Sequence, residues 1–165
     1  MPARRVLPVF VLLSACPVGD PCEGTEGVAP SLVLGEGPDG FARELEPGDT
    51  MAAAFGPQGG FHVWPAVRTT GFAPGLPGRG PSGDRDLPTF EASIFAGPVL
   101  IESVETIRIM QGNGASAELG LFVLPVGDDP AALDGATSYR LEVRGADVCG
   151  TTLEAAEDVF IFLEP

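Results

Sequence analysis

Short apolar runs separated by turn-forming residues dominate the chain after residue 30, and this pattern predicts β-strands. The clearest run is Tyr139–Arg144, where apolar and charged residues alternate strictly, so that the apolar side chains share one face. No long apolar stripe with the 3.6-residue helical period occurs. The predicted strands are Ser31–Gly35, Phe41–Leu45, Thr50–Phe55, Phe61–Thr69, Thr89–Ala96, Val99–Ser103, Val104–Met110, Ala117–Leu124, Ser138–Arg144 and Val159–Leu163.

The links between these strands carry recognisable turn chemistry. Gln111–Gly114 predicts a hairpin turn, because Asn-Gly accommodates positive φ at both central positions. Asp128–Gly135 and Leu153–Asp158 are each predicted to form one helical turn. Gly71–Pro88 is so rich in glycine and proline that it predicts a long exposed loop. Together these elements predict one all-β domain over residues 31–165, an immunoglobulin-like β-sandwich.

The first residues have the pattern of an export signal. Arg4 and Arg5 precede an apolar run, Val6–Leu13, which small residues connect to Cys16. As a helix, eight residues span only about 12 Å, far less than the roughly 30 Å core of a bilayer. The run therefore predicts a cleaved signal peptide rather than a transmembrane helix.

Leu13-Ser14-Ala15-Cys16 closely resembles the lipobox of bacterial lipoproteins. The resemblance implies cleavage before Cys16, a signal peptide over residues 1–15, and a lipid-anchored tether over residues 16–30. The Cys16 thiol would carry diacylglycerol, with palmitate as one of its fatty acids. Residue 17 is proline, not the aspartate that retains many such proteins in the inner membrane, so the resemblance implies the outer membrane in a Gram-negative cell. The alternative is an ordinary secretory signal with Cys16 as a chance cysteine.

The charge of the chain limits the partners it can have. It carries 23 acidic and 9 basic residues, a formal net charge of −14, and every basic residue is arginine. Such acidity disfavours nucleic acid, whose phosphates need cationic side chains, and it disfavours a polybasic membrane patch. The expected membrane contact is therefore the lipid alone. The charge itself predicts solubility, and the alternative is a dedicated cationic ligand. The sequence does not specify a protein or envelope partner.

With Cys16 lipidated, Cys22 and Cys149 remain. An even number of cysteines in an oxidising compartment predicts one disulfide, and the alternative is two unpaired buried thiols. Cys22 lies just before the first predicted strand, and Cys149 lies in the turn of the last predicted hairpin. An immunoglobulin-type topology would bring these two positions to the same end of the sandwich.

Two further stretches are similar to known sequences. The C-terminal stretch Tyr139–Leu163, with Asp147-Val148-Cys149-Gly150 between its strands, is similar to the last hairpin of bacterial Ig-like domains. Gly56–Trp64 is similar to a motif of uncharacterised lipoproteins from high-GC bacteria. Neither resemblance implies an activity.

Candidate chemistry in the domain is sparse. The strand predicted over Phe61–Thr69 would place His62, Trp64 and Arg68 on one face, as a small recognition patch or simply as solvated neighbours of a packed Trp64. No G-x-S-x-G, C-x-x-C or H-E-x-x-H motif occurs. The acidic pairs Asp84/Asp86 and Asp128/Asp129 fall short of the six to eight oxygens that Ca²⁺ requires. No catalytic residue, metal site or cofactor is predicted.

The sequence therefore predicts a non-enzymatic extracytoplasmic lipoprotein, anchored to the cell envelope and acting there as a binding or structural module. The alternative is a small hydrolase or metal-dependent enzyme that uses loop carboxylates. The surroundings of His62, the only histidine, discriminate between them, because an enzyme of this kind needs carboxylates near that imidazole in a concave pocket.

Overall fold

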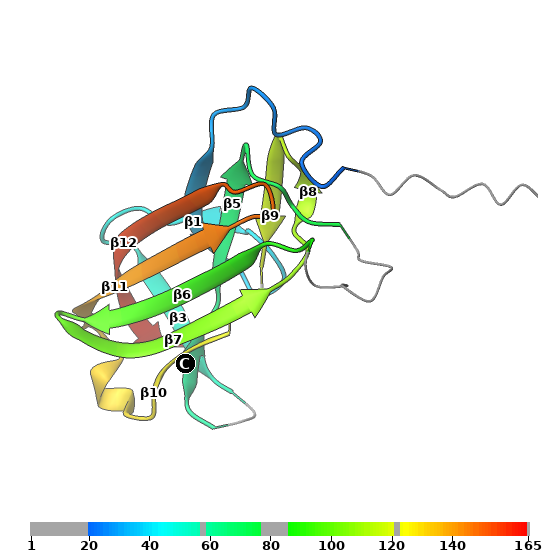
Figure 1. Cartoon of the computed structure of the whole chain (residues 1–165). Coiled ribbons are helices and arrows are strands. Elements are labelled where there is room, and N and C mark those ends of the chain that lie inside the picture. Colours follow the sequence, from blue (N-terminus) through cyan, green and yellow to red (C-terminus); the bar gives the residue numbers. More distant parts are fainter. Residues whose placement is uncertain (1–19, 57–58, 77–85, 121–122, 165) are drawn as a thin grey trace, which may run out of the picture.

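A computed structural model describes residues 20–56, 59–76, 86–120 and 123–164 (Figure 1). Two β-sheets pack against each other in an immunoglobulin-like β-sandwich, which confirms the predicted all-β class. The described residues include one short 3₁₀ helix, η1 (Pro130–Ala132). Within these residues no helix has the length and apolar character needed to cross a membrane.

The smaller sheet has five antiparallel strands. Their spatial order is β2 (Arg43–Glu44), β1 (Ser31–Glu36), β5 (Pro65–Thr70), β9 (Ser116–Leu119) and β8 (Gln111–Asn113). The larger sheet has seven strands in the order β10 (Leu124–Gly127), β4 (Phe61–Val63), β3 (Thr50–Phe55), β12 (Thr152–Leu163), β11 (Asp134–Ala146), β6 (Thr89–Ala96) and β7 (Val99–Ile107). Within the larger sheet, β3 and β12 run parallel and every other neighbouring pair is antiparallel.

The core lies between the two sheets, because every second side chain of each strand points into this space. The larger sheet contributes fully buried side chains such as Phe90, Leu141 and Ile161, and Leu34 and Val67 face them from the smaller sheet. Full burial of one such side chain contributes roughly 1.5–3 kcal/mol. The strict alternation of Tyr139–Arg144 therefore has the predicted result, with Tyr139, Leu141 and Val143 inside the sandwich.

Two predicted strands are wrong because the chain changes sheets within them. The run Phe61–Thr69 divides at Trp64, which separates β4 in the larger sheet from β5 in the smaller one. Likewise Ala117–Leu124 divides into β9 and β10, which belong to different sheets. Leu119 and Leu124, which alternation would place on opposite faces, are both buried because they belong to different sheets, and residues 121–122 lie outside the described part of the chain.

Other strands and turns also differ from the predicted bounds. The predicted strands Val99–Ser103 and Val104–Met110 join in the single strand β7, which ends at Ile107, and Leu153–Asp158 lies inside β12 rather than in a helical turn. The predicted turn in Asp128–Gly135 is present as η1. A hairpin joins β8 to β9 as predicted, although its loop is Gly114-Ala115, one residue later than expected.

The predicted exposure of Gly71–Pro88 is wrong for its first part. Phe72 is fully buried, and its ring centroid lies 5.4 Å from that of Phe90. The backbone here is also paired, since Met110 donates its N–H to the Pro74 carbonyl at 2.9 Å. A single phenylalanine within a Gly/Pro-rich segment thus fills the end of the core. Residues 77–85 lie outside the described part of the chain.

Residues 20–30, the described part of the predicted tether, lie against the domain. The Thr70 hydroxyl donates a hydrogen bond to the Ala29 carbonyl at 3.0 Å, and a Cβ at Gly71 would collide with the Val28 carbonyl. This segment therefore packs against the domain before the chain enters β1.

Candidate functional site

A disulfide joins Cys22 to Cys149, as the cysteine count and topology predicted. The Cα atoms are 5.8 Å apart, and the bond spans 127 residues of sequence. Cys22 lies in the segment before β1, and Cys149 lies in the turn between β11 and β12. Cys16, the predicted lipidation site, lies outside the described residues.

Each half of the disulfide is positioned by an aspartate two residues earlier. The Asp20 carboxylate accepts the Cys22 N–H at 2.9 Å, and the Asp147 carboxylate accepts the Cys149 N–H at 2.9 Å. Asp side chains readily make such local bonds to the backbone two residues later. The repeated Asp-x-Cys pattern was visible in the sequence, but its role became clear only from the structure.

Asp147 also connects the hairpin turn to the rest of the domain. Its carboxylate accepts the N–H of Thr151 and the N–H of Ala73, each at 2.8 Å. One side chain thus holds both the turn that carries Cys149 and the segment that buries Phe72. The disulfide end is therefore held together by the disulfide and by the hydrogen bonds of Asp20 and Asp147.

The recognition patch predicted from His62, Trp64 and Arg68 does not form. His62 is only 7% exposed, and its imidazole lies so close to Gly56 that a Cβ there would not fit. Arg68 is in the other sheet, where its guanidinium pairs with Glu118 at 2.8 Å and lies 4.1 Å from the centre of the Phe41 ring. The division of the predicted strand at Trp64 explains the error.

The described residues contain no group of three or more His, Cys, Asp or Glu side chains arranged to hold a metal ion. Of the acidic pairs considered from the sequence, Asp129 caps η1 by accepting the Ala131 N–H at 2.9 Å. Asp84 lies outside the described residues.

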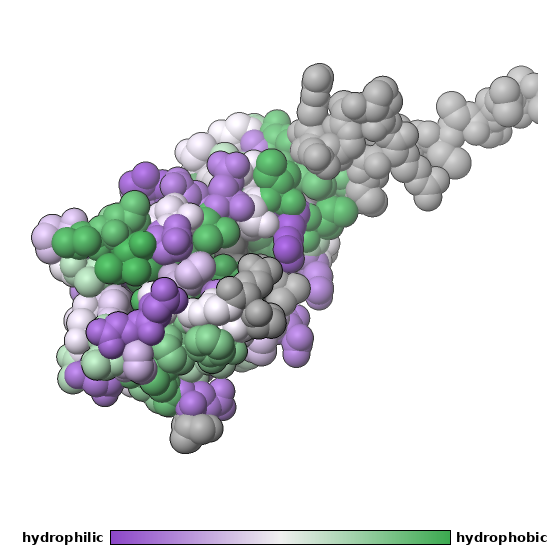
Figure 2. Space-filling model, turned by 90° about the horizontal axis from the view of Figure 1, so that it is seen from below, coloured by the Kyte–Doolittle hydropathy of each residue, from purple (hydrophilic) through white to green (hydrophobic). Residues whose placement is uncertain are grey.

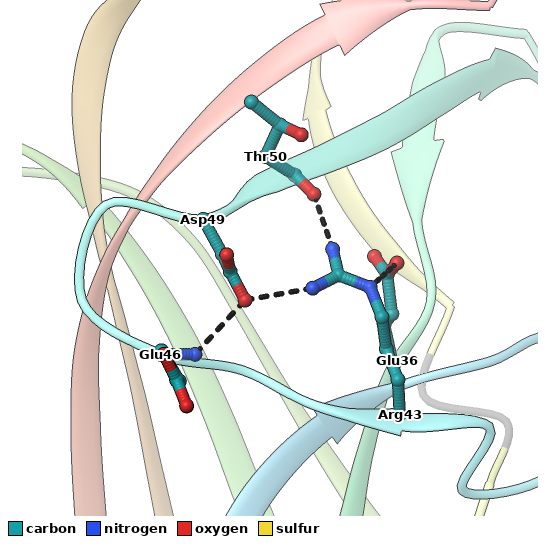
Figure 3. A network of polar contacts seen from close by, with 5 residues as sticks. All are labelled: Glu36, Arg43, Glu46, Asp49 and Thr50. Atoms are coloured by element: carbon teal, nitrogen blue, oxygen red, sulfur yellow. Dashed lines mark hydrogen bonds and ion pairs between the residues drawn. The ribbon is translucent and has the colours of Figure 1, made fainter.

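Arg43 makes a polar link between the two sheets (Figure 3). Its guanidinium pairs with Glu36 of β1 and with Asp49, each at 2.7 Å, and donates to the Thr50 carbonyl of β3 at 2.6 Å. The N–H of Glu46 donates to the same Asp49 carboxylate at 3.0 Å. The Glu46 N–H and then Arg43 lower the pKa of Asp49 below its usual range. This network connects β2 and β1 of the smaller sheet to the start of β3 in the larger one.

A second polar surface lies on the outer side of β7, β6, β11 and β12, and we name it the four-strand face. Strand register places its side chains in rows that cross all four strands. One row is Glu105, Glu91, Arg144 and Glu154; the next is Ser103, Ser93, Glu142 and Ala156; the third is Leu100, Phe95, Arg140 and Asp158. These rows depend on register, so the sequence pattern alone did not reveal them.

The four-strand face is hollowed rather than flat. A shallow depression of about 520 Å³ lies between Glu91, Glu105, Arg144 and Glu154, and a second of about 170 Å³ reaches Phe95 and Leu100. A third, of about 390 Å³, lies over Arg140 and Ala156. The arrangement offers carboxylates, hydroxyls and an apolar end to an extended ligand, and it offers no imidazole or thiol.

No model of a known protein family matches the chain, and a search of curated proteins finds no matching sequence.

Proposed function

We propose that this protein is an extracytoplasmic lipoprotein, anchored through Cys16, that acts as a binding or structural module of the cell envelope. The observation that supports the proposal most directly is the Cys22–Cys149 disulfide. Such bonds form and persist in oxidising compartments outside the cytoplasm. The charged and apolar residues before Cys16 also have the pattern of an export signal.

The anchor and the fold are compatible in their geometry. Cys16 lies a few residues before Cys22, so lipid on Cys16 would hold the disulfide end of the sandwich close to the membrane. The β6–β7 turn lies at the other end, because Ala146 beside the disulfide turn pairs with Thr89 whereas Tyr139 pairs with Ala96. The β6–β7 end would therefore face away from the membrane.

The anchor is tested by Cys16→Ala in cells that produce the protein. We expect the variant to lose labelling by radioactive palmitate and to leave the membrane fraction, because several acyl chains give firm attachment whereas none remains here. A double variant, Cys22→Ser with Cys149→Ser, is the matched control and should still be labelled. Continued palmitate labelling of Cys16→Ala would disprove the assignment.

The membrane to which the protein sorts has a test of its own in a Gram-negative host. Pro17→Asp should move the lipidated protein from the outer to the inner membrane in a density gradient. An unchanged distribution between the membranes would contradict outer-membrane sorting through this position.

A further inference from the structure

The four-strand face carries two facing carboxylates, Glu91 and Glu105, that make no ion pair with any described residue, although Arg144 of β11 is the strand neighbour of Glu91. Glu91 and Glu105 lie directly opposite each other on β6 and β7, and both point outward. Among the described residues, Glu105 has neither an ion pair nor a side-chain hydrogen bond, and Glu91 accepts only the Ser103 hydroxyl, at 3.0 Å. Like charges in this position destabilise a sheet, so a cation above the pair would be stabilising.

The arginines of this face are already engaged by other acids. Arg140 pairs with Glu142 at 2.9 Å, and Arg144 lies 3.8 Å from Glu154 and 4.0 Å from Glu142. The face therefore holds five carboxylates, those of Glu91, Glu105, Glu142, Glu154 and Asp158, against two guanidinium groups. Its net charge is negative even within an acidic protein.

The same face ends in an exposed apolar patch. Half-buried Phe95 lies opposite Leu100, which is 51% exposed, and the next residue, Ile101, is 38% exposed. Figure 2 shows hydrophobic side chains gathered at the end of the molecule where the β6–β7 hairpin turns. An exposed apolar group beside a polar surface is one of the features of protein-binding sites.

We propose that the four-strand face binds a basic, extended segment of another protein. A cationic side chain of this segment would lie above Glu91 and Glu105, and an apolar side chain would cover Phe95 and Leu100. Glu91 and Phe95 are four residues apart on one strand, which is about 13 Å. A segment that runs along the strands would therefore carry its Lys or Arg about four residues from its apolar residue.

Charge selects this occupant over the others that an apolar patch can attract. A second copy would present the same carboxylates and would be repelled, and anionic lipid headgroups would be repelled as well. The inference rests on the proposed role as an envelope binding module and names the surface and the chemistry of its partner. It does not depend on the lipid at Cys16.

The test is site-specific crosslinking of the full-length protein in the cells that produce it. A photoreactive benzophenone amino acid replaces Phe95 on the proposed surface, and in a second protein it replaces Phe55, a 70% exposed residue on β3 outside this face. We expect one adduct of discrete mass from position 95 and none from position 55. Sequencing of the crosslinked partner peptide should place Lys or Arg about four residues from the attachment site.

Charge variants show whether the adduct reports the proposed contact. Glu105→Arg should lower the yield at position 95 about two- to fivefold, as loss of one exposed ion pair implies, and added salt should lower it too. Glu105→Gln provides a second, milder variant. Glu44→Arg is the matched control, since Glu44 is exposed on β2 in the other sheet and its replacement changes the net charge equally.

Each other outcome would overturn the inference. These outcomes are an adduct of twice the chain mass, a lipid adduct, no adduct, or an adduct whose yield ignores Glu105→Arg and salt. Fractionation and palmitate labelling of the same cells report on the anchor separately. Failure of the anchor and failure of the binding surface are thus distinguishable.

Discussion

At the scale of single residues, the carboxylate of Asp147 accepts hydrogen bonds from three backbone N–H groups. Asp147→Ala should lower the free energy of unfolding by about 2–3 kcal/mol, because hydrogen bonds to a charged group are strong and three donors lose their acceptor. Denaturant unfolding with the disulfide intact measures the change. Asp129→Ala is the control, where loss of one capping bond should cost about 1 kcal/mol or less. Equal losses in the two variants would contradict this role of Asp147.

Asp49 gives a prediction of pH dependence at the same scale. Its pKa in the folded protein lies below the ordinary value of 3.8, because the Glu46 N–H and Arg43 stabilise its charged form. A lowered folded pKa means that its contribution to stability is present above pH 3.8 and is lost as the pH falls further, through the folded pKa. Asp49→Asn should therefore lower stability at neutral pH and flatten its decline in acid. Parallel acid profiles for the variant and the wild type would contradict the prediction.

At the scale of elements, the pairing of β6 with β7 includes one pair of like charges, Glu91 opposite Glu105. Glu105→Arg should turn the repulsion with Glu91 into an attraction and raise the free energy of unfolding by about 0.2–1 kcal/mol. Equilibrium unfolding in urea, with Glu44→Arg for comparison, measures this. A loss of stability in Glu105→Arg would show that the two carboxylates do not repel each other. A gain in stability together with lost crosslinking would show that Glu105 contributes to binding at the expense of stability.

Several strands that stay in one sheet were predictable, and the two runs that change sheets were not. Thr50–Phe55 and Thr89–Ala96 have the bounds that their apolar runs and flanking turn residues predicted. The chain passes from one sheet to the other at Trp64 and again between β9 and β10, so the side that is buried reverses there. The alternation of neighbouring residues does not reveal such a change of sheet. Residues Leu153–Asp158 failed for another reason, because pairing with β11 overrides their moderate helix propensity.

At the scale of the whole molecule, the disulfide was predictable because two cysteines allow one pairing and the topology brings them together. The four-strand face was not, because its rows exist only once β7, β6, β11 and β12 are in register. The burial of Phe72 was missed because composition describes the average of a segment and not its one large side chain. The sequence thus predicts local strands and a disulfide that has only one possible pairing, whereas the side chains that meet on a sheet face depend on strand register.

The disulfide also gives a prediction at this scale. Replacing Cys22 and Cys149 with serine should lower the free energy of unfolding by about 2–4 kcal/mol, since the bond restricts a long loop of the unfolded chain. Thermal unfolding of the variant and of the reduced wild type should then give similar midpoints. A variant as stable as the oxidised protein would show that the hydrogen bonds of Asp20 and Asp147 hold this end without the bond.

The covalent joint between the two ends of the sequence also determines how the domain responds to force. Tension that enters before Cys22 passes through the sulfur atoms to the β11–β12 turn as well as into β1. From there it runs lengthwise along β11, whose neighbours β6 and β12 are bonded to it from Tyr139 to Ala146. A pull toward the β6–β7 end therefore loads many hydrogen bonds in shear at the same time, and β1 is protected from being peeled away one bond after another.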